Sequence, residues 1–247
     1  MNIAIVGTGA MGKILKELID KKDGLKCAGV VEPLDGQKLT DLKERIDIIM
    51  DFSNPANLNM IEEFARQHGC GVIIATTGFS EKQRQQILEL SQKVPVVKAA
   101  NFSLGITIMK KVLKQITPIL KDNFDMEIIE KHHNKKLDSP SGTAKMLAEA
   151  MNPKSEFNQV YGREGDGKRG KEIGIHAVRG GTIAGEHTVI FAGEDELLEI
   201  KHTAASKKIF ALGALKAAEF LGERITTGRN CGEISVGLYD IEEVLFL

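Results

Sequence analysis

The sequence contains few cysteines, no tryptophan and no long apolar run. Its three cysteines, Cys27, Cys70 and Cys231, stand singly, so they form neither a CxxC pair nor the spacing of a zinc site. Reduced thiols in a cytosolic protein are the simplest explanation of that spacing. No apolar stretch approaches the roughly 18 residues that a membrane-spanning helix needs, so we expect no membrane partner.

Neither sign of charge dominates the sequence. Its 33 lysines and arginines nearly balance its 34 aspartates and glutamates. Because a protein that binds nucleic acid through its phosphates usually has a basic excess, we expect no nucleic-acid partner. The first residues lead directly into a glycine loop, without the basic segment and cleavage site of an export signal. We therefore expect a cytoplasmic protein.

The first hundred residues alternate short apolar runs with amphipathic stretches. Strands are expected at residues 2–6, 25–31, 47–52, 71–75 and 94–98. Helices are expected at residues 11–21, 55–67 and 81–92. Strands of nearly continuous Ile and Val, separated by helices, are typical of a parallel sheet covered on both faces. The pattern predicts an α/β fold with a Rossmann-type, doubly wound parallel sheet.

The pattern changes near residue 103. Further helices are expected at residues 106–116, 144–151 and 206–221, and strands at 126–131, 173–178, 187–191 and 197–202. In the last helix, four alanines predict a narrow face for close packing: Ala211, Ala214, Ala217 and Ala218. Residues 162–174 are rich in Gly, Lys and Arg and predict a long loop. The alternation in the later strands suits an antiparallel or mixed sheet with one covered face, so we expect a second, α+β domain, built on a mixed sheet.

A glycine loop follows the first predicted strand. It consists of Gly7, Thr8, Gly9, Ala10, Met11 and Gly12 and fits the pattern GxGxxG. Such glycines allow a tight turn, a close approach of the backbone to a pyrophosphate, and packing of the next helix on its strand. The helix N-terminus then offers N–H groups to the phosphates. Because a glycine loop can also be a plain connector, the residues around it matter.

An acidic residue stands at the end of the second predicted strand. Glu32 lies 20 residues after Gly12, where a carboxylate can accept hydrogen bonds from the ribose hydroxyls of a dinucleotide. A carboxylate there repels a 2′-phosphate, and the next residue is Pro33 rather than an arginine. We therefore expect NADH to be favoured, while Lys38 leaves NADPH as an alternative.

Polar residues also follow three other predicted strands, in the segments 51–53, 75–79 and 99–103. Each could be a plain helix cap. Ligands of open α/β sheets bind outside the carboxyl ends of the strands, so three such segments on one edge predict a cofactor cleft.

The segment 130–143 combines two histidines and three lysines with the start of a predicted helix at Pro140-Ser141-Gly142-Thr143. The N–H groups and hydroxyls at that helix start predict a carboxylate site. A solvated basic loop before a capped helix is the alternative. We expect no metal, because adjacent histidines on a strand point to opposite faces and no further ligand stands at a suitable spacing.

These segments resemble the family of 4-hydroxy-tetrahydrodipicolinate reductases, or dihydrodipicolinate reductases, over nearly the whole chain. The most specific match is residues 130–144, which are similar to the family signature E-x-H-H-x-x-K-x-D-x-P-S-G-T-A. Residues 75–79, 99–105, 175–193 and 237–245 are similar to further family segments.

The resemblance implies hydride transfer from NAD(P)H to 4-hydroxy-tetrahydrodipicolinate, a cyclic dicarboxylic imine of lysine and diaminopimelate synthesis. It implies that His132 is the proton donor and acceptor and that Lys136 is a proton donor. It also implies that His133 contacts the substrate and that Gly142 and Thr143 hold a substrate carboxylate. Besides the glycine loop and Glu32, the implied cofactor residues are Ala75, Thr76, Thr77, Ala99, Ala100, Asn101 and Phe102.

The family fold implies a domain division. Residues 1–103 and 206–247 would form the dinucleotide-binding Rossmann domain, and residues 104–205 the substrate-binding and oligomerisation domain of a homotetramer. Three departures concern the cofactor: the glycine loop is a residue shorter than usual and has Ala10, Ala75 replaces a glycine, and Pro33 stands where some members have an arginine.

Two other functions fit parts of the sequence. An NAD(H)-binding sensor without turnover would need the glycine loop and Glu32, but not His132 or Lys136. Another Rossmann oxidoreductase of amino-acid metabolism would share the first domain, although the segment 130–143 argues against it.

Overall fold

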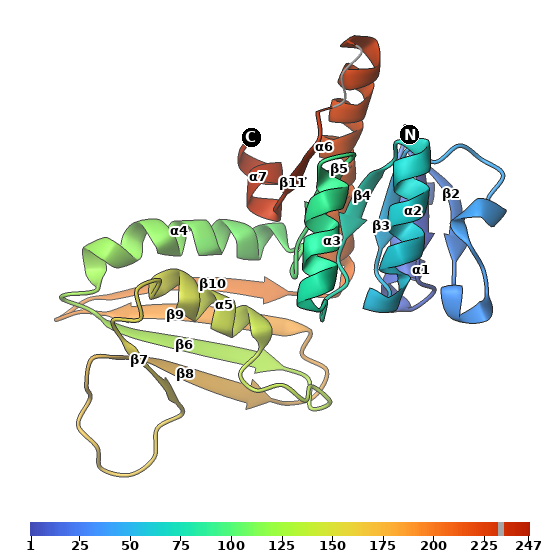
Figure 1. Ribbon diagram of the computed structural model, residues 1–247. Coiled ribbons are helices and arrows are strands. Elements are labelled where there is room, and N and C mark those ends of the chain that lie inside the picture. Colours follow the sequence, from blue (N-terminus) through green and yellow to red (C-terminus); the bar gives the residue numbers. More distant parts are fainter. Residues whose placement is uncertain (232–234) are drawn as a thin grey trace. The chain divides into compact units, whose positions relative to one another are not determined.

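Residues 1–231 and 235–247 are described by a computed structural model, and the chain divides into two units (Figure 1). Met1–Leu104 and Lys208–Leu247 make the first unit, and Gly105–Lys207 makes the second. Residues 232–234, in the segment predicted to complete the Rossmann domain, lie outside the described residues, as does the side chain of Cys231. No helix in the described ranges is long and apolar enough to cross a membrane.

The first unit is built on a six-stranded sheet with the order β11-β5-β4-β3-β1-β2. Its strands are β1 (Asn2–Val6), β2 (Lys26–Val31), β3 (Ile48–Asp51), β4 (Gly71–Ile74), β5 (Pro95–Lys98) and β11 (Gly237–Tyr239). Every pairing along this order is parallel. The parallel sheet expected from the sequence is confirmed, and β11 adds a strand that was not predicted.

Helices cover both faces of this sheet. The core on one face includes residues of α1 (Ala10–Asp20), α6 (Lys208–Cys231) and α7 (Ile241–Phe246), and the core on the other includes residues of α2 (Leu58–His68) and α3 (Glu81–Ser91). Successive side chains of a strand point to opposite faces. In β1, Ile3 and Ile5 therefore join the first core and Ala4 and Val6 the second, and all four are fully buried. The doubly wound prediction is confirmed.

Helix α6 extends beyond its predicted range. Its apolar face continues because Ile225, one turn after Leu221, is buried in the same core. The four alanines expected to form a narrow packing face are all fully buried: Ala211, Ala214, Ala217 and Ala218. On this helix, a Cβ added at Gly213 would lie 1.7 Å from the carbonyl oxygen of Phe102. Glycine therefore lets α6 pack directly against the segment that follows β5.

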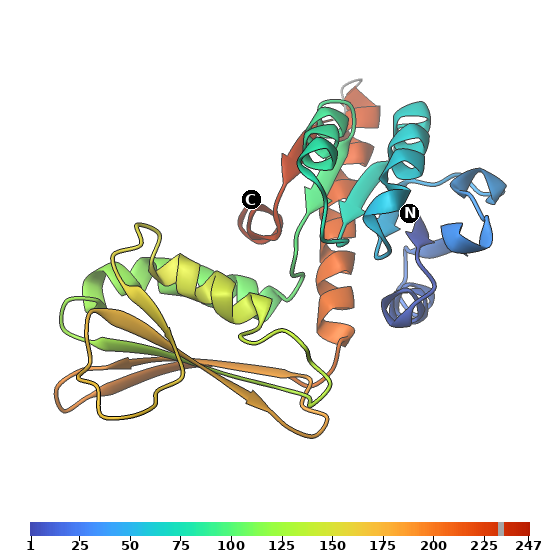
Figure 2. The same cartoon turned by 60° about the horizontal axis from the view of Figure 1, so that its bottom comes forward.

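The second unit is a five-stranded mixed sheet with the order β10-β9-β6-β8-β7. Its strands are β6 (Asp125–His132), β7 (Asn158–Tyr161), β8 (Glu172–Arg179), β9 (Gly185–Ala192) and β10 (Leu197–Ala204). Strands β6, β7 and β8 are parallel, and β9 runs antiparallel to β6 and β10. Helices α4 (Leu104–Leu120) and α5 (Gly142–Met151) lie over one face of the sheet (Figures 1 and 2). The mixed sheet with one covered face is confirmed.

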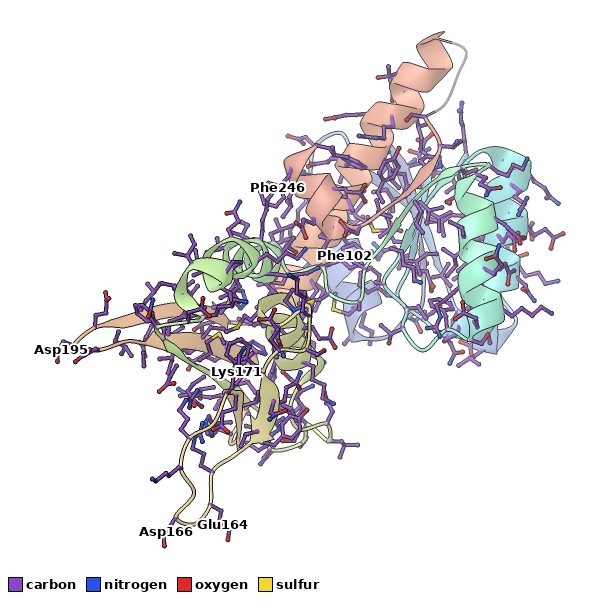
Figure 3. The ribbon with its side chains drawn as sticks, turned by 60° about the vertical axis from the view of Figure 1, so that its left-hand side comes forward. Phe102, Glu164, Asp166, Lys171, Asp195 and Phe246 are labelled. Carbon is purple, nitrogen blue, oxygen red and sulfur yellow. The ribbon has the colours of Figure 1, made fainter. Side chains whose placement is uncertain are left out.

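The loop between β7 and β8 spans residues 162–171, which is shorter than predicted because β8 begins at Glu172. Arg163 and Arg169 both pair with Glu127 of β6, the former at 2.7 Å. The tip of the loop, at Asp166, projects away from the sheet (Figure 3). Ion pairs therefore hold the two ends of the loop, while its tip has open surroundings.

The contact of Gly213 with Phe102 allows a test of the fold. On helix propensity alone, Gly213→Ala should stabilise the protein by about 1 kcal/mol. The added Cβ would overlap a carbonyl oxygen, and overpacking of this kind costs about 1–3 kcal/mol. We expect a net loss of stability in urea unfolding, with Leu212→Ala on the exposed side of α6 as the control. A Gly213→Ala protein as stable as the wild type would contradict this packing.

Candidate active site

The parallel strands bring the residues predicted to bind the cofactor to one edge of the first sheet. The glycine loop (residues 7–12) follows β1, Glu32 follows β2, residues 75–77 follow β4, and residues 99–102 follow β5. Since all these strands run in the same direction, the four segments share one edge. The strand order reverses between β1 and β3, which is where open α/β sheets bind their ligands.

Two glycines of the glycine loop are required by the backbone. Gly7 has a φ of 107°, and an added Cβ would lie 2.6 Å from the carbonyl oxygen of Phe52. At Gly12, a Cβ would lie 2.0 Å from the carbonyl oxygen of Gly7. By contrast, a Cβ added at Gly9, just before α1, would have no described atom within 4 Å apart from those of Gly9 and its two neighbours in the chain. The loop is therefore tight at both ends and open in the middle, as a pyrophosphate site requires.

The carboxylate of Glu32 contacts the glycine loop directly. Its Oε2 accepts hydrogen bonds from the backbone N–H of Thr8 at 3.1 Å and from the Thr8 hydroxyl at 2.8 Å. These bonds from Thr8 lower the pKa of Glu32. The carboxylate is therefore ionised at neutral pH and lies beside the open part of the loop.

Other side chains at this edge contact one another and stabilise the segments that follow the strands. Asp51 is 1% exposed, and its Oδ1 accepts a 2.5 Å hydrogen bond from the Ser53 hydroxyl. Burial raises the pKa of Asp51. The backbone N–H of Ser53 donates to the hydroxyl of Thr76 at 2.9 Å. The ring of Phe102 is buried, with its centroid 6.0 Å from that of Phe52. The side chains of Thr76 and Phe102 thus have structural partners, whereas Thr77 and Ala100 are exposed.

In the second unit, β6 carries a buried charge. Its residues Met126, Ile128, Glu130 and His132 alternate onto the buried side of the strand, and Glu130 has no exposed surface. Burial alone would raise the pKa of Glu130, but hydrogen bonds from Arg179, His132 and the Ser141 backbone outweigh it and lower that pKa. Glu130 is therefore a buried carboxylate ion.

The predicted catalytic residues lie at and just after the end of β6. His132 is 9% exposed, and its Nδ1 lies 2.6 Å from Oε2 of Glu130. His133 has a buried Nδ1 without a hydrogen-bond partner in the described part of the chain. The ammonium group of Lys136 pairs with the Asp138 carboxylate at 2.7 Å. Carboxylates therefore offset the like-charge repulsion that a basic cluster would otherwise create.

Helix α5 begins at the predicted carboxylate site. Ser141 is its N-cap, and the Ser141 hydroxyl accepts a 3.1 Å hydrogen bond from the backbone N–H of Ala144. Gly142 and Thr143 are the first helical residues, and Gly142 is exposed. The helix dipole adds partial positive charge at this end. The hydroxyl of Ser141 also lies 3.0 Å from Nε2 of the buried His187.

The sequence did not predict a functional role for Glu130, Arg179 or His187. Arg179, at the end of β8, donates two hydrogen bonds to Glu130 across 49 residues of sequence. Glu130 stands two residues before His132, so the period of a strand already places both on one face. That spacing could have linked Glu130 to His132 from the sequence alone. The pairing of Glu130 with Arg179 could not be found in this way, because it depends on which strands are neighbours.

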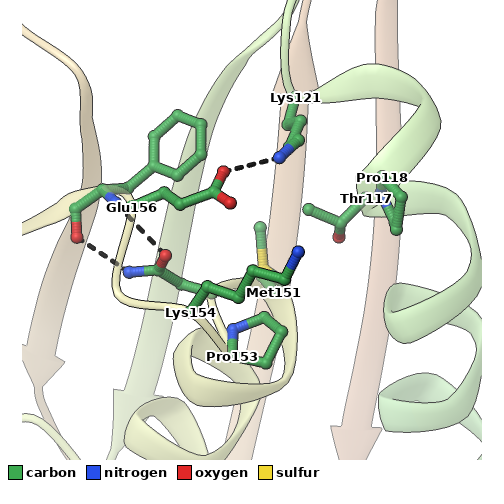
Figure 4. A pocket seen from close by; sticks show the side chains of 9 residues that line it. Thr117, Pro118, Lys121, Met151, Pro153, Lys154 and Glu156 are labelled. Carbon is green, nitrogen blue, oxygen red and sulfur yellow. Dashed lines mark hydrogen bonds and ion pairs between the residues drawn. The ribbon is translucent and has the colours of Figure 1, made fainter.

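A separate pocket of about 130 Å³ lies between the ends of α4 and α5 (Figure 4). Thr117, Pro118 and Met151 line it, and the ion pair of Lys121 with Glu156, at 2.5 Å, borders it. None of the predicted site residues lines this pocket. Among the described residues, no cluster of three His, Cys, Asp or Glu side chains is arranged to hold a metal ion.

Comparison with known proteins gives consistent matches along the chain. Residues 1–102 match the family described as dihydrodipicolinate reductase, N-terminus, and residues 105–245 match dihydrodipicolinate reductase, C-terminus. A 4-hydroxy-tetrahydrodipicolinate reductase of Brachyspira hyodysenteriae is 42% identical and covers 99% of this chain and 100% of its own. Another, of Exiguobacterium sp., is 42% identical over 91% of each chain.

Solved structures share the fold. A dipicolinate-bound dihydrodipicolinate reductase from Paenisporosarcina sp. has a TM-score of 0.76 at 22% identity, covering 100% of this chain and 99% of that chain. DAP dehydrogenase of C. glutamicum has a TM-score of 0.57 at 13% identity, over 98% of this chain and 93% of its own. The two family matches and the sequence identities agree over both units, and the chain belongs to the dihydrodipicolinate reductase family.

Proposed function

We propose that this protein reduces 4-hydroxy-tetrahydrodipicolinate to tetrahydrodipicolinate in lysine and diaminopimelate synthesis, with NADH as the preferred cofactor. The substrate gains a hydride and a proton, and its hydroxyl group leaves as water. The observation that carries the proposal is the second unit's cluster, in which His132 at the end of β6 and the N-terminus of α5 are both bound to Glu130. An acid–base group and an anion site held together suit the protonation of a carboxylated substrate. The curated relatives compared above support this function and neither alternative.

The first unit's residues fit a dinucleotide. The open space at Gly9 and the N-terminus of α1 would hold the pyrophosphate, and Glu32 would accept the ribose hydroxyls. When bound, the reduced nicotinamide supplies the hydride. The ionised Glu32 would repel a 2′-phosphate, which supports the preference for NADH.

The second unit's residues would bind and orient the substrate. Gly142 and Thr143 at the start of α5 would hold one carboxylate, and the buried Nδ1 of His133 would gain a partner on substrate binding. Lys136 would exchange Asp138 for a substrate group, which is feasible because the Asp138 side chain is 54% exposed. A bound dicarboxylate would thereby replace contacts that the protein now makes with itself.

His132 would exchange protons through Nε2. Its Nδ1 is engaged by Glu130, and a Cβ added at Gly185 would lie 3.1 Å from Nε2. Glycine at 185 thus leaves room for a substrate atom beside Nε2. Burial, together with charge repulsion from His132, lowers the pKa of His187 to about 4, so His187 stays neutral near neutral pH. His187 therefore adds no second positive charge beside the ring of His132.

A homotetramer and a cytoplasmic location remain predictions. The second unit's sheet supports an assembly role, because α4 and α5 lie over one face and no helix within Gly105–Lys207 lies over the other (Figure 2).

We expect His132→Gln and Lys136→Met each to lower kcat about 100-fold or more, because each removes a proton-transfer group. NADH oxidation with freshly generated substrate measures the rate, and fluorescence titration should show unchanged NADH binding. Lys135→Met, which changes an exposed neighbouring lysine, is the matched control. Wild-type kcat in both variants would contradict the proposed roles.

We expect Glu32→Gln to raise the ratio of kcat/KM for NADPH to that for NADH about tenfold, because it removes a negative charge from the place of the 2′-phosphate. Asp35→Asn removes an exposed charge from the next turn and should shift the ratio little. Steady-state kinetics with both cofactors measure it. An unchanged ratio in Glu32→Gln would show that Glu32 does not select the cofactor.

The stability of the protein should depend on His187 between pH 6.5 and pH 4. In this range the unfolded chain binds a proton at His187 and the folded chain does not, so stability falls as the pH falls. A pKa shift from 6.5 to about 4 corresponds to about 3 kcal/mol at most. Urea unfolding at pH 7 and pH 5 should show a smaller pH dependence in His187→Gln than in the wild type or in His68→Gln, which changes an exposed histidine. Equal pH dependence in all three proteins would rule out this contribution.

A further inference from the structure

The carboxylate of Glu130 is the meeting point of three segments of the second unit. Its Oε2 accepts hydrogen bonds from Nδ1 of His132 at 2.6 Å and from Nη1 of Arg179 at 2.8 Å. Its Oε1 accepts from Nη2 of Arg179 at 2.7 Å and from the backbone N–H of Ser141 at 2.9 Å. The ends of β6 and β8 and the start of α5 are thus joined through one side chain.

Stability alone gives little reason for such an arrangement. A buried ion pair loses its hydration, and well-packed apolar residues of similar volume often stabilise a fold as well or better. The two-bond pairing of Arg179 with Glu130 instead fixes the carboxylate in one orientation. A fixed carboxylate is useful where other groups must be oriented by it.

The first group that Glu130 orients is the ring of His132. An ionised carboxylate can only accept, so Nδ1 of His132 must carry a hydrogen and Nε2 is left to exchange a proton. The same carboxylate stabilises the ring when it becomes positively charged. The ring also faces the neutral His187 of β9, with centroids 5.2 Å apart, but His187 bonds to Ser141 and not to His132.

The second group is the segment between His132 and α5, which carries Lys136. Glu130 holds the backbone N–H of Ser141, directly before Gly142. Nη2 of Arg179 also donates to the carbonyl oxygen of Asp138 at 2.6 Å. Glu130 and Arg179 therefore fix the end of this segment, at Asp138 and Ser141. They also fix the proposed carboxylate site at the start of α5.

We propose that Glu130 and Arg179 are a pair of positioning residues, which hold the proton on Nδ1 of His132 and align that ring with the N-terminus of α5. The inference rests on the proposed function for its role in turnover. Neither residue is assigned a substrate contact. Their effect is exerted through His132, Ser141 and Asp138.

The test compares Glu130→Gln with the wild type. The amide has nearly the same shape but can donate to Nδ1, which favours the opposite tautomer of His132. We expect kcat to fall about 100-fold, the pH profile of kcat to change, and NADH binding to stay the same. Arg179→Lys keeps the charge but cannot make both hydrogen bonds, so its loss of kcat should be smaller.

The matched control is Glu172→Gln, which alters another Glu–Arg pair of the same sheet, that of Glu172 with Arg163 at 2.5 Å. It should leave kcat and the pH profile unchanged. If Glu130→Gln also leaves both unchanged, the inference is overturned. If Glu130→Gln does not fold, Glu130→Asp replaces it, because the shorter aspartate side chain cannot reach both His132 and Arg179. An unchanged pH profile of kcat in Glu130→Asp would overturn the inference equally.

A second readout separates this inference from the proposed function. The ¹⁵N NMR signals of the His132 ring report which nitrogen carries the hydrogen, and they require no turnover. We expect hydrogen on Nδ1 in the wild type and a shift toward Nε2 in Glu130→Gln. The same tautomer in both proteins would overturn the inference. A wild-type protein that shows the expected tautomers but does not reduce the substrate would overturn only the proposed function.

Discussion

The carboxylate of Glu130 has no access to water, so the protein itself must compensate its charge. Arg179, the ring of His132 and the backbone of Ser141 do so together, and these groups come from separate parts of the chain. Removing one of them would leave a buried charge partly unpaired. The local structure of the second unit at this point therefore follows from the need to satisfy one side chain.

The first unit depends on a different constraint, the close approach of backbone to backbone. Gly7 lies against the carbonyl of Phe52, and Gly12 against that of Gly7. These contacts leave no room for a side chain at either glycine, so the backbone itself packs between the ends of β1 and β3, and Thr8 adds the hydrogen bonds to Glu32. The open position at Gly9 is what remains accessible to a ligand. Steric exclusion thus shapes one unit as charge compensation shapes the other.

The elements that could be predicted are those with a strong local pattern. Continuous apolar runs marked β1 to β5, and the spacing of four alanines marked the buried face of α6. Strand β7, with Val160 as its one aliphatic residue, and the three-residue β11 have too little pattern to be recognised. The bond of Arg179 to Glu130 could not be predicted because it requires the parallel pairing of β8 with β6. Local periodicity carries no information on which strands become neighbours.

The first unit is made from both ends of the sequence, and this affects the order in which it can form during synthesis. Until Lys208–Leu247 has been made, the core face that α6 and α7 help to bury stays open and β5 is an unpaired edge. Exposed edges and apolar faces invite association with other chains. A nascent chain that ends within the second unit would therefore carry an incomplete sheet, so the last helices protect the first strands.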